Sequence, residues 1–287
     1  MNELHKLYSP SCWSKRFSTP EEVIQYHLKF IEEASRNVKA EIPCQLNIPY
    51  GPSDRQKFDI IGTDLNDDAP IFIFVHGGYW QVKEITRESY HFIAKNLHKN
   101  DIKSIFVGYD LCPDVTIPEI ACQIEKAAQK CIEYAKEKKS KRIYFMGHSA
   151  GAHLVASLFR NFVTRLPEVD RSIVRGAILS SGVFDLLPIQ KTVINEPLRL
   201  DEKVALEMSP LKQNLCGSGT TFYSIVGGNE SPEFIKQSRD FYHKLNDLGF
   251  QSCFSIIENV DHFDIIELLS REEYELTKRI IDIIKRE

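Results

Sequence analysis

The chain has 287 residues, of which 43% are hydrophobic and 26% charged, an ordinary composition for a globular protein. Its 36 Lys and Arg residues against 40 Asp and Glu residues give a net charge of −4, which disfavours nucleic-acid binding. The polar start of the chain does not resemble a signal peptide, and the longest apolar run, Ile71 to Val75, is far too short to span a membrane. Seven cysteines without metal or redox spacing favour free thiols, so we expect a cytoplasmic location, with the nucleus left open.

Short β-branched or aromatic runs alternate with helical patterns along the chain. The first 45 residues contain a helix around 21–34 and are expected to form an N-terminal extension. Apolar character on both faces predicts buried strands at 71–75, 104–107, 142–146, 177–179 and 222–226. A last strand is expected at 253–257.

The predicted helices lie between these strands. Apolar residues spaced three and four apart follow Pro118, and Ser231 with Pro232 is a typical helix start for a helix that Gly249 ends. Another helix is expected at about 265–285. This alternation predicts one α/β domain over 1–287, with a mostly parallel central sheet flanked by helices on both faces. The proline-containing stretch at about 186–215 interrupts the pattern and is expected to form a small helical cap.

The motif GHSAG at 147–151 follows the strand that ends at Met146. Between a buried strand and a helix, G-x-S-x-G predicts a nucleophile elbow, because glycines permit the tight turn. Ser149 is the expected nucleophile, and the N–H group of Ala150 is expected to donate to an oxyanion. A glycine-rich turn of purely structural use is the alternative.

A second glycine-rich motif, His76-Gly77-Gly78-Tyr79-Trp80, directly follows the first buried strand. Such a turn can direct N–H groups at a developing negative oxygen, and Gly78 and Tyr79 are the expected donors. His76 is expected to be a hydrogen-bonded structural residue under the loop. The rings of Tyr79 and Trp80 are expected either to line an aromatic slot or to pack in the core.

The general base is expected late in the chain, because this architecture orders its residues as nucleophile, acid and histidine. His262 lies between the last strand and the last helix, where that histidine belongs. Five other histidines fall in polar or helical stretches and are expected at the surface: His5, His27, His91, His98 and His243. His148 and His153 flank the elbow without a third metal ligand, and no metal or organic cofactor is expected.

The acid is expected in the turn after the penultimate strand, where Glu230 is the only carboxylate before the next helix. Glu230 would accept the Nδ1 proton of His262 and so fix its tautomer. Asp185, one strand earlier, is the alternative acid. Asp261 and Asp264 are expected to cap the last helix.

Ser149, Glu230 and His262 together predict a serine hydrolase. Several stretches then resemble the kynurenine formamidase (arylformamidase) family: HGGYWQ at 76–81, GHSAGAHL at 147–154, SGVFDL at 181–186, SPEF at 231–234 with QSRDFY at 237–242, and VDHFDI at 260–265. The opening YSPSCW at 8–13 also resembles that family, so the resemblance covers nearly the whole chain.

The resemblance implies a soluble α/β-hydrolase, often a homodimer, that cleaves N-formyl-L-kynurenine to L-kynurenine and formate in tryptophan catabolism. The family usually carries Asp where this chain has Glu230, so Asp185 stays open as the acid. The flat leaving group of that substrate would lie against Tyr79, Trp80 or Phe184. A carboxylesterase acting on short acyl esters and a non-catalytic α/β-hydrolase binding protein are the alternatives.

Overall fold

The computed structural model describes residues 3–216 and 219–286, and its centre is an eight-stranded sheet. The strands are β1 Cys44–Pro49, β2 Lys57–Ile61, β3 Ile71–Val75, β4 Lys103–Val107, β5 Ile143–His148, β6 Val174–Ser180, β7 Thr221–Gly227 and β8 Ser252–Ile257. They lie in the order β1-β2-β4-β3-β5-β6-β7-β8. β2 is antiparallel to both of its neighbours, and all other pairs are parallel. The predicted mostly parallel α/β sheet is confirmed.

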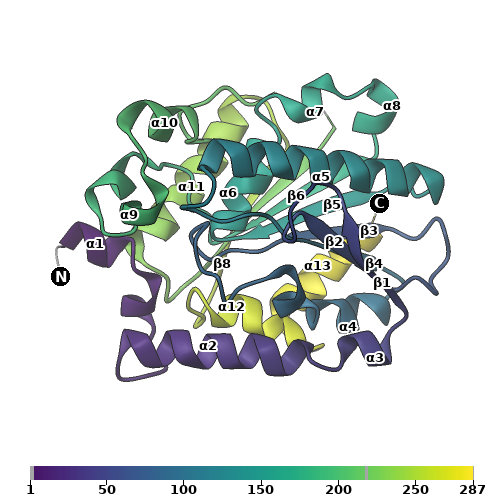
Figure 1. The fold of residues 1–287 in the computed structure, drawn as a ribbon, viewed down its shortest axis with the longest axis horizontal. Coiled ribbons are helices and arrows are strands. Elements are labelled where there is room, and N and C mark those ends of the chain that lie inside the picture. The colour runs from purple at the N-terminus through teal and green to yellow at the C-terminus, as the bar shows by residue number, and fades with distance from the viewer. Residues whose placement is uncertain (1–2, 217–218, 287) are drawn as a thin grey trace.

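Helices cover both faces of this sheet (Figure 1). On one side lie α5 Ile117–Glu137, α6 Ala150–Ser157 and α11 Pro232–Asp247. On the other lie α2 Pro20–Ser35, α4 Ile93–His98, α12 Asp264–Glu267 and α13 Glu275–Lys285. The shorter elements are α1 Glu3–Leu7, η1 Pro10–Trp13, α3 Val38–Glu41, η2 Arg87–Tyr90, α7 Phe162–Arg165, α8 Glu168–Arg171, η3 Leu187–Lys191, α9 Asn195–Leu198, α10 Glu202–Glu207 and η4 Leu268–Ser270. Each face of the sheet therefore has its own apolar core.

All six runs predicted as strands are strands in the structure. The first matches β3, whose five residues are all buried, because helices exclude water from both of its faces. The edge strand β1 and its antiparallel neighbour β2 were not predicted. β1 alternates half-buried and exposed residues and contains Asn47 at a positive φ, so it lacks a continuous apolar run.

The helix starts follow local capping chemistry. At α2, the Thr19 hydroxyl accepts a hydrogen bond from the Glu22 N–H, and the Glu22 carboxylate accepts one from the Thr19 N–H. Ser231 caps α11 as predicted, and Gly249 adopts a positive φ just after its end. These local signals fix where α2 and α11 begin.

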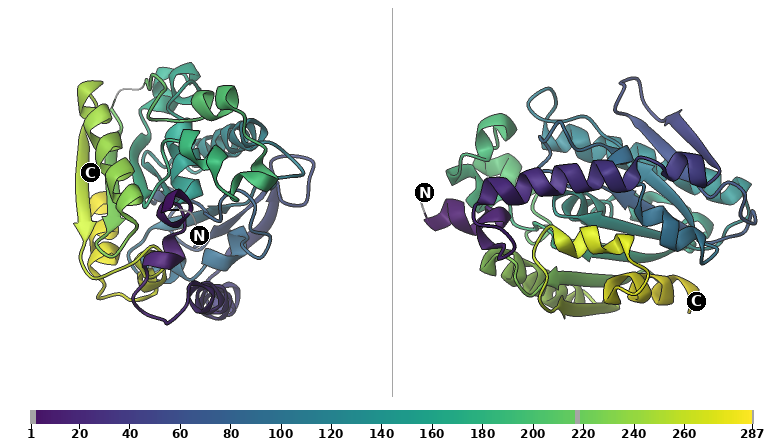
Figure 2. Two further views of the ribbon diagram at one scale, coloured as in Figure 1. Left: turned by 90° about the vertical axis from the view of Figure 1, so that its left-hand side faces the viewer. Right: turned by 90° about the horizontal axis from the view of Figure 1, so that it is seen from below.

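The prediction of one helix over 265–285 is wrong, because the chain there forms α12, η4 and α13. The Asn96 side-chain amide donates to the Leu269 carbonyl at 2.9 Å, an acceptor that a continuous helix would use for its own backbone. The break follows directly after this contact and leaves α12 free to lie beside α2 (Figure 2).

Candidate active site

Ser149 occupies a sharp turn between β5 and α6. Its φ of 56° and ψ of −122° are strained for a residue with a side chain, and its N–H donates to the Ser180 carbonyl at 2.9 Å. A Cβ added to Gly151 would lie 2.0 Å from the Val75 carbonyl oxygen, so only glycine fits there. The turn therefore packs tightly against the end of β3 and has the geometry of a nucleophile elbow.

His262 and Glu230 meet from two neighbouring loops. The His262 Nδ1 atom lies 2.7 Å from Glu230 Oε2, and the two side chains are 6% and 0% exposed. A Cβ on Gly227 would lie 2.5 Å from the Val260 carbonyl oxygen, so glycine permits the close approach of these loops. An ionised carboxylate only accepts hydrogen bonds, so Nδ1 carries the proton and Nε2 keeps a lone pair.

Asp185, the alternative acid, has other partners. Its carboxylate lies 3.1 Å from the Lys212 ammonium and accepts a hydrogen bond from the Leu187 N–H at 3.0 Å. Among the hydrogen bonds of residues 3–216 and 219–286, the carboxylate bound to the His262 ring is that of Glu230.

The loop after β3 holds three consecutive residues at positive φ: Gly78 at 99°, Tyr79 at 48° and Trp80 at 58°. Within the described ranges, no hydrogen bond uses the N–H groups of Gly78 and Tyr79. Ala150 is the first residue of α6, where a backbone N–H has no partner inside the helix. These three N–H groups are therefore available to an oxyanion.

His76 lies under this loop as a hydrogen-bonded residue. Its ring stacks on Tyr109 with centroids 4.3 Å apart, and its Nδ1–H donates to the Gly77 carbonyl at 2.9 Å. Burial lowers the pKa of His76 to about 4, so the ring is neutral and packs as part of the loop's support.

A cavity of about 240 Å³ contains both Ser149 and His262. Most of its wall is aromatic or aliphatic, with Tyr79, Tyr90 and Phe263 among the lining rings. The N-terminal segment contributes a large share of the wall: Tyr8, Ser9, Pro10, Ser11, Ile24, His27 and Leu28. Sequence reasoning left the role of this segment open, and in the structure it lines the pocket that contains Ser149 and His262.

The structure places the other two predicted wall residues in the core. Trp80 is fully buried and packs edge-on against His153 of α6, with ring centroids 5.0 Å apart. Phe184 is also fully buried and stacks on Phe241 at 4.2 Å. Neither ring lines the cavity, because each lies against a helix on the far side of its loop.

Comparison with known proteins identifies the fold and the family of the chain. A family model of the alpha/beta hydrolase fold matches residues 72–220. A kynurenine formamidase of Salmo salar is 34% identical over 289 residues, which cover 99% of this chain and 96% of the relative. The chain belongs to the kynurenine formamidase family. A second family member, from Danio rerio, is 33% identical over 99% of this chain and 96% of its own length. A solved structure, a proposed thioesterase from Silicibacter sp., is 28% identical with a TM-score of 0.78 and covers 99% of each chain.

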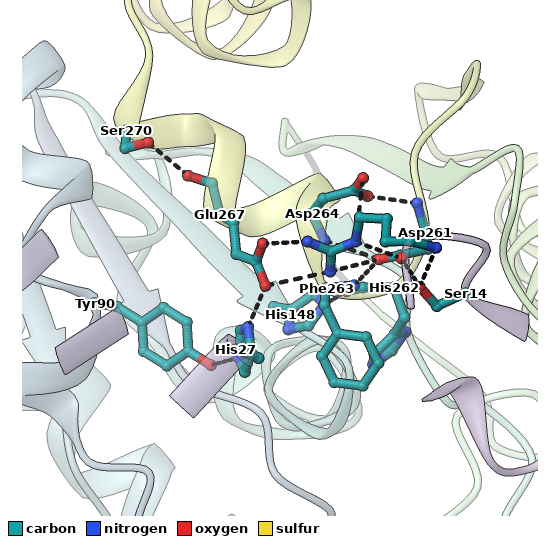
Figure 3. Close-up of polar contacts among 11 residues, drawn as sticks. Ser14, His27, Tyr90, His148, Asp261, His262, Phe263, Asp264, Glu267 and Ser270 are labelled. Atoms are coloured by element: carbon teal, nitrogen blue, oxygen red, sulfur yellow. Dashed lines mark hydrogen bonds and ion pairs between the residues drawn. The ribbon is translucent and has the colours of Figure 1, made fainter. Parts of the chain in front are cut away.

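In this member of the kynurenine formamidase family, a buried polar network borders the cavity (Figure 3). Arg16 from the N-terminal segment lies 2.8 Å from Asp261 and 2.7 Å from Glu267. The Asp261 carboxylate also accepts from the N–H groups of Phe263 and Asp264 at the start of α12. The N-cap residue of α12 is Phe263 and Asp264 is its first residue, so neither predicted aspartate is the N-cap. Arg16 therefore ties the start of the chain to the loop that carries His262.

Two carboxyl groups of this network have shifted pKa values in opposite directions. Burial alone would raise the pKa of Asp261, but hydrogen bonds from Arg16 and Ser14 outweigh burial and lower it to about 2. Burial and the neighbouring Asp261 charge raise the pKa of Asp264 to about 7. Asp261 is thus the permanent negative charge of the pair.

The prediction that His27 and His91 lie at the surface is wrong, because both are only 3% exposed. His27 Nδ1 lies 2.9 Å from a Glu267 oxygen, and His91 Nε2 lies 3.1 Å from Asp59. A sequence signal existed for His27: it lies four residues from Val23 and four from Ile31, on the buried face of α2.

Proposed function

We propose that the protein is a serine hydrolase that cleaves the formamide bond of N-formyl-L-kynurenine to give L-kynurenine and formate. The observation that carries the proposal is the 2.7 Å contact between His262 and Glu230 in the cavity that contains the strained Ser149. The full-length relatives named kynurenine formamidase support the choice of substrate. The reaction belongs to tryptophan catabolism.

Ser149 is the nucleophile of the proposed reaction. His262 Nε2 takes the hydroxyl proton as the Ser149 oxygen attacks the formyl carbon, and Glu230 stabilises the resulting imidazolium. Proton transfer of this kind contributes about 100- to 10,000-fold in rate. The negative oxygen of the tetrahedral intermediate accepts hydrogen bonds from the N–H groups of Gly78, Tyr79 and Ala150. Each such donor is worth roughly 100- to 1,000-fold.

The second half of the reaction releases both products. The imidazolium of His262 returns its proton to the aryl amine nitrogen as the C–N bond breaks, which leaves a formyl ester on Ser149. Water, deprotonated by His262, then attacks this ester and releases formate. No metal or organic cofactor enters any step.

The cavity suits this substrate in shape. A formyl group needs little space beside Ser149, and the flat aryl ring can lie against the aromatic faces of Tyr79 and Phe263. The wall is largely apolar, as a site for an aromatic leaving group requires.

A rate comparison tests the proposal. Initial rates on N-formyl-L-kynurenine and on p-nitrophenyl acetate are measured for wild type, Ser149→Ala and Glu230→Ala, with Asp185→Asn as the control. We expect the formamide to give the higher kcat/KM, both active-site variants to lose at least about a thousandfold, and the control to match wild type.

Other results would change the assignment. Turnover of the ester alone would make the protein a carboxylesterase. Loss of activity in Asp185→Asn, but not in Glu230→Ala, would move the acid to Asp185. A serine-reactive probe that fails to label wild type would indicate a binding protein without catalysis.

The homodimer, which the family resemblance implies, and the cytoplasmic location, which the free cysteines favour, stay predictions. Over residues 3–216 and 219–286, no helix has the length and apolar character needed to cross a membrane. Sedimentation of the purified protein would test the dimer directly.

A further inference from the structure

The cavity contains a second histidine–glutamate pair that the proposed chemistry does not use. His27 Nδ1 lies 2.9 Å from Glu267 Oε1, and His27 Nε2 lies 3.3 Å from the Tyr90 hydroxyl oxygen. Figure 3 shows the contacts of His27 with Glu267 and Tyr90. His27 and Tyr90 both line the cavity, and both are almost fully buried. This pair repeats the arrangement of His262 with Glu230 at another point of the same wall.

The ring of Phe263 relates the two pairs in space. Its centroid lies 5.4 Å from that of His262 and 5.2 Å from that of His27, with an edge-on geometry in both cases. Each imidazole therefore contacts the same aromatic side chain. In N-formyl-L-kynurenine, a benzene ring and a short chain likewise separate the formamide from the amino-acid end. A substrate with its formyl group at Ser149 can thus extend towards His27.

Near His27, the side chains that line the cavity offer hydrogen bonds and not full charges. No Asp, Glu, Lys or Arg side chain is among the described residues that line it. Both oxygens of Glu267 are already engaged, by His27 and by Arg16, so no carboxylate is left for an ammonium group. Arg16 is within 4 Å of Asp261, Asp264 and Glu267, so its charge is already paired inside the network.

We propose that His27 and Tyr90 form the subsite for the α-carboxylate of the substrate's amino-acid end. Glu267 accepts the Nδ1 proton of His27, and Nε2 faces the Tyr90 hydroxyl. In the proposed complex the carboxylate binds together with one proton, carried on Nε2, so that Nε2–H and the Tyr90 hydroxyl both donate to it. The inference rests on the proposed function for the identity of the substrate, but it predicts a preference in binding that does not depend on turnover.

Direct binding to the full-length chain tests this subsite. Isothermal titration compares 4-(2-aminophenyl)-4-oxobutanoate, which has the carboxylate but no α-amino group, with 2-aminobutyrophenone, which has neither. We expect wild type to bind the acid at least about tenfold more tightly, the size of one charge-assisted hydrogen bond. His27→Gln and Tyr90→Phe should each reduce this ratio by about threefold or more.

His98→Gln is the matched control, because His98 pairs with Asp64 outside the cavity, and it should leave both Kd values unchanged. Equal binding of the two compounds by wild type would overturn the proposal. So would a His27→Gln or Tyr90→Phe variant that binds both compounds more weakly by the same factor, since that indicates a purely structural role. Turnover of N-formyl-L-kynurenine is measured separately: a chain without formamidase activity that keeps the His27-dependent preference would refute the function and not the subsite.

Discussion

Replacement of the Glu230 carboxylate by an amide tests the active-site geometry most directly. Its Oε2 atom lies 2.7 Å from His262 Nδ1, and its side chain is fully buried, so solvent does not reach the carboxylate. In Glu230→Gln, an amide N–H facing Nδ1 would force the imidazole proton onto Nε2, which then cannot accept the Ser149 proton. We expect kcat/KM to fall about 10,000-fold, as for the corresponding change in other triads. That factor corresponds to about 5.5 kcal/mol of lost transition-state stabilisation.

Glu230→Asp keeps the negative charge and changes only the length of the side chain. The side chain becomes shorter by one carbon–carbon bond, about 1.5 Å, so a contact of normal length would open beyond hydrogen-bond distance. The backbone cannot easily follow, because the Asn229 N–H donates to the Val260 carbonyl at 2.8 Å and holds the two loops together. A displacement of this size costs about 100-fold in rate.

Initial rates on N-formyl-L-kynurenine measure both effects, and thermal unfolding of each variant verifies that it folds. Asp185→Asn is the control and should retain full activity. A Glu230→Gln variant within about tenfold of wild type would refute the role of this carboxylate. A fully active Glu230→Asp variant would show that the turn after β7 adjusts, and the argument from a fixed loop spacing would fail.

Three further predictions concern stability. Gly151→Ala places a methyl group only 2.0 Å from the Val75 carbonyl oxygen. Urea unfolding should therefore show that the free energy of unfolding falls by at least about 3 kcal/mol. A decrease of less than about 1 kcal/mol would contradict this packing. Arg16→Ala removes the cation that pairs with the buried carboxylates of Asp261 and Glu267. The free energy of unfolding, again measured in urea, should fall by about 3 kcal/mol. An unchanged urea midpoint would contradict the ion-pair argument. The Asp264 pKa is raised to about 7, so its contribution to stability is present below about pH 4 and is lost as the pH rises through 7. Asp264→Asn should therefore flatten the fall in unfolding free energy between acidic and neutral pH, and a slope equal to that of wild type would contradict it.

The sequence predicted those parts of the fold that depend on neighbours along the chain. A strand buried on both faces, such as β3, needs a continuous apolar run, and that run is visible without any structure. The turn at Ser149 has its glycines within two residues, and α11 has its cap and its terminating Gly249 at the ends of the helix. The edge strand β1 lacks such a signal, since a half-exposed strand need not be apolar.

The cavity wall could not be predicted in the same way, because it depends on contacts between distant parts of the chain. Arg16 and Asp261 are 245 residues apart in sequence, and no local pattern marks them as partners. His27 was expected at the surface because it falls in a helical stretch that contains many charged residues, but its neighbours along the helix face, Val23 and Ile31, are buried. Trp80 lies in the loop after β3, beside the expected oxyanion donors, and its position in the sequence suggests a wall residue. In the structure its ring is buried in the core.

The same long-range contacts imply that the first part of the chain and the loop of His262 form one cooperative unit. Arg16 forms an ion pair with the Asp261 carboxylate. That carboxylate accepts hydrogen bonds from the N–H groups of Phe263 and Asp264, the two residues after His262. Arg16 also holds Glu267, which orients His27. The guanidinium group of Arg16 thus supports two imidazoles: His262, the proposed base, and His27, which is proposed to bind the substrate's carboxylate. Loss of this group should therefore weaken catalysis and substrate selectivity together, although Arg16 is not among the residues that line the cavity.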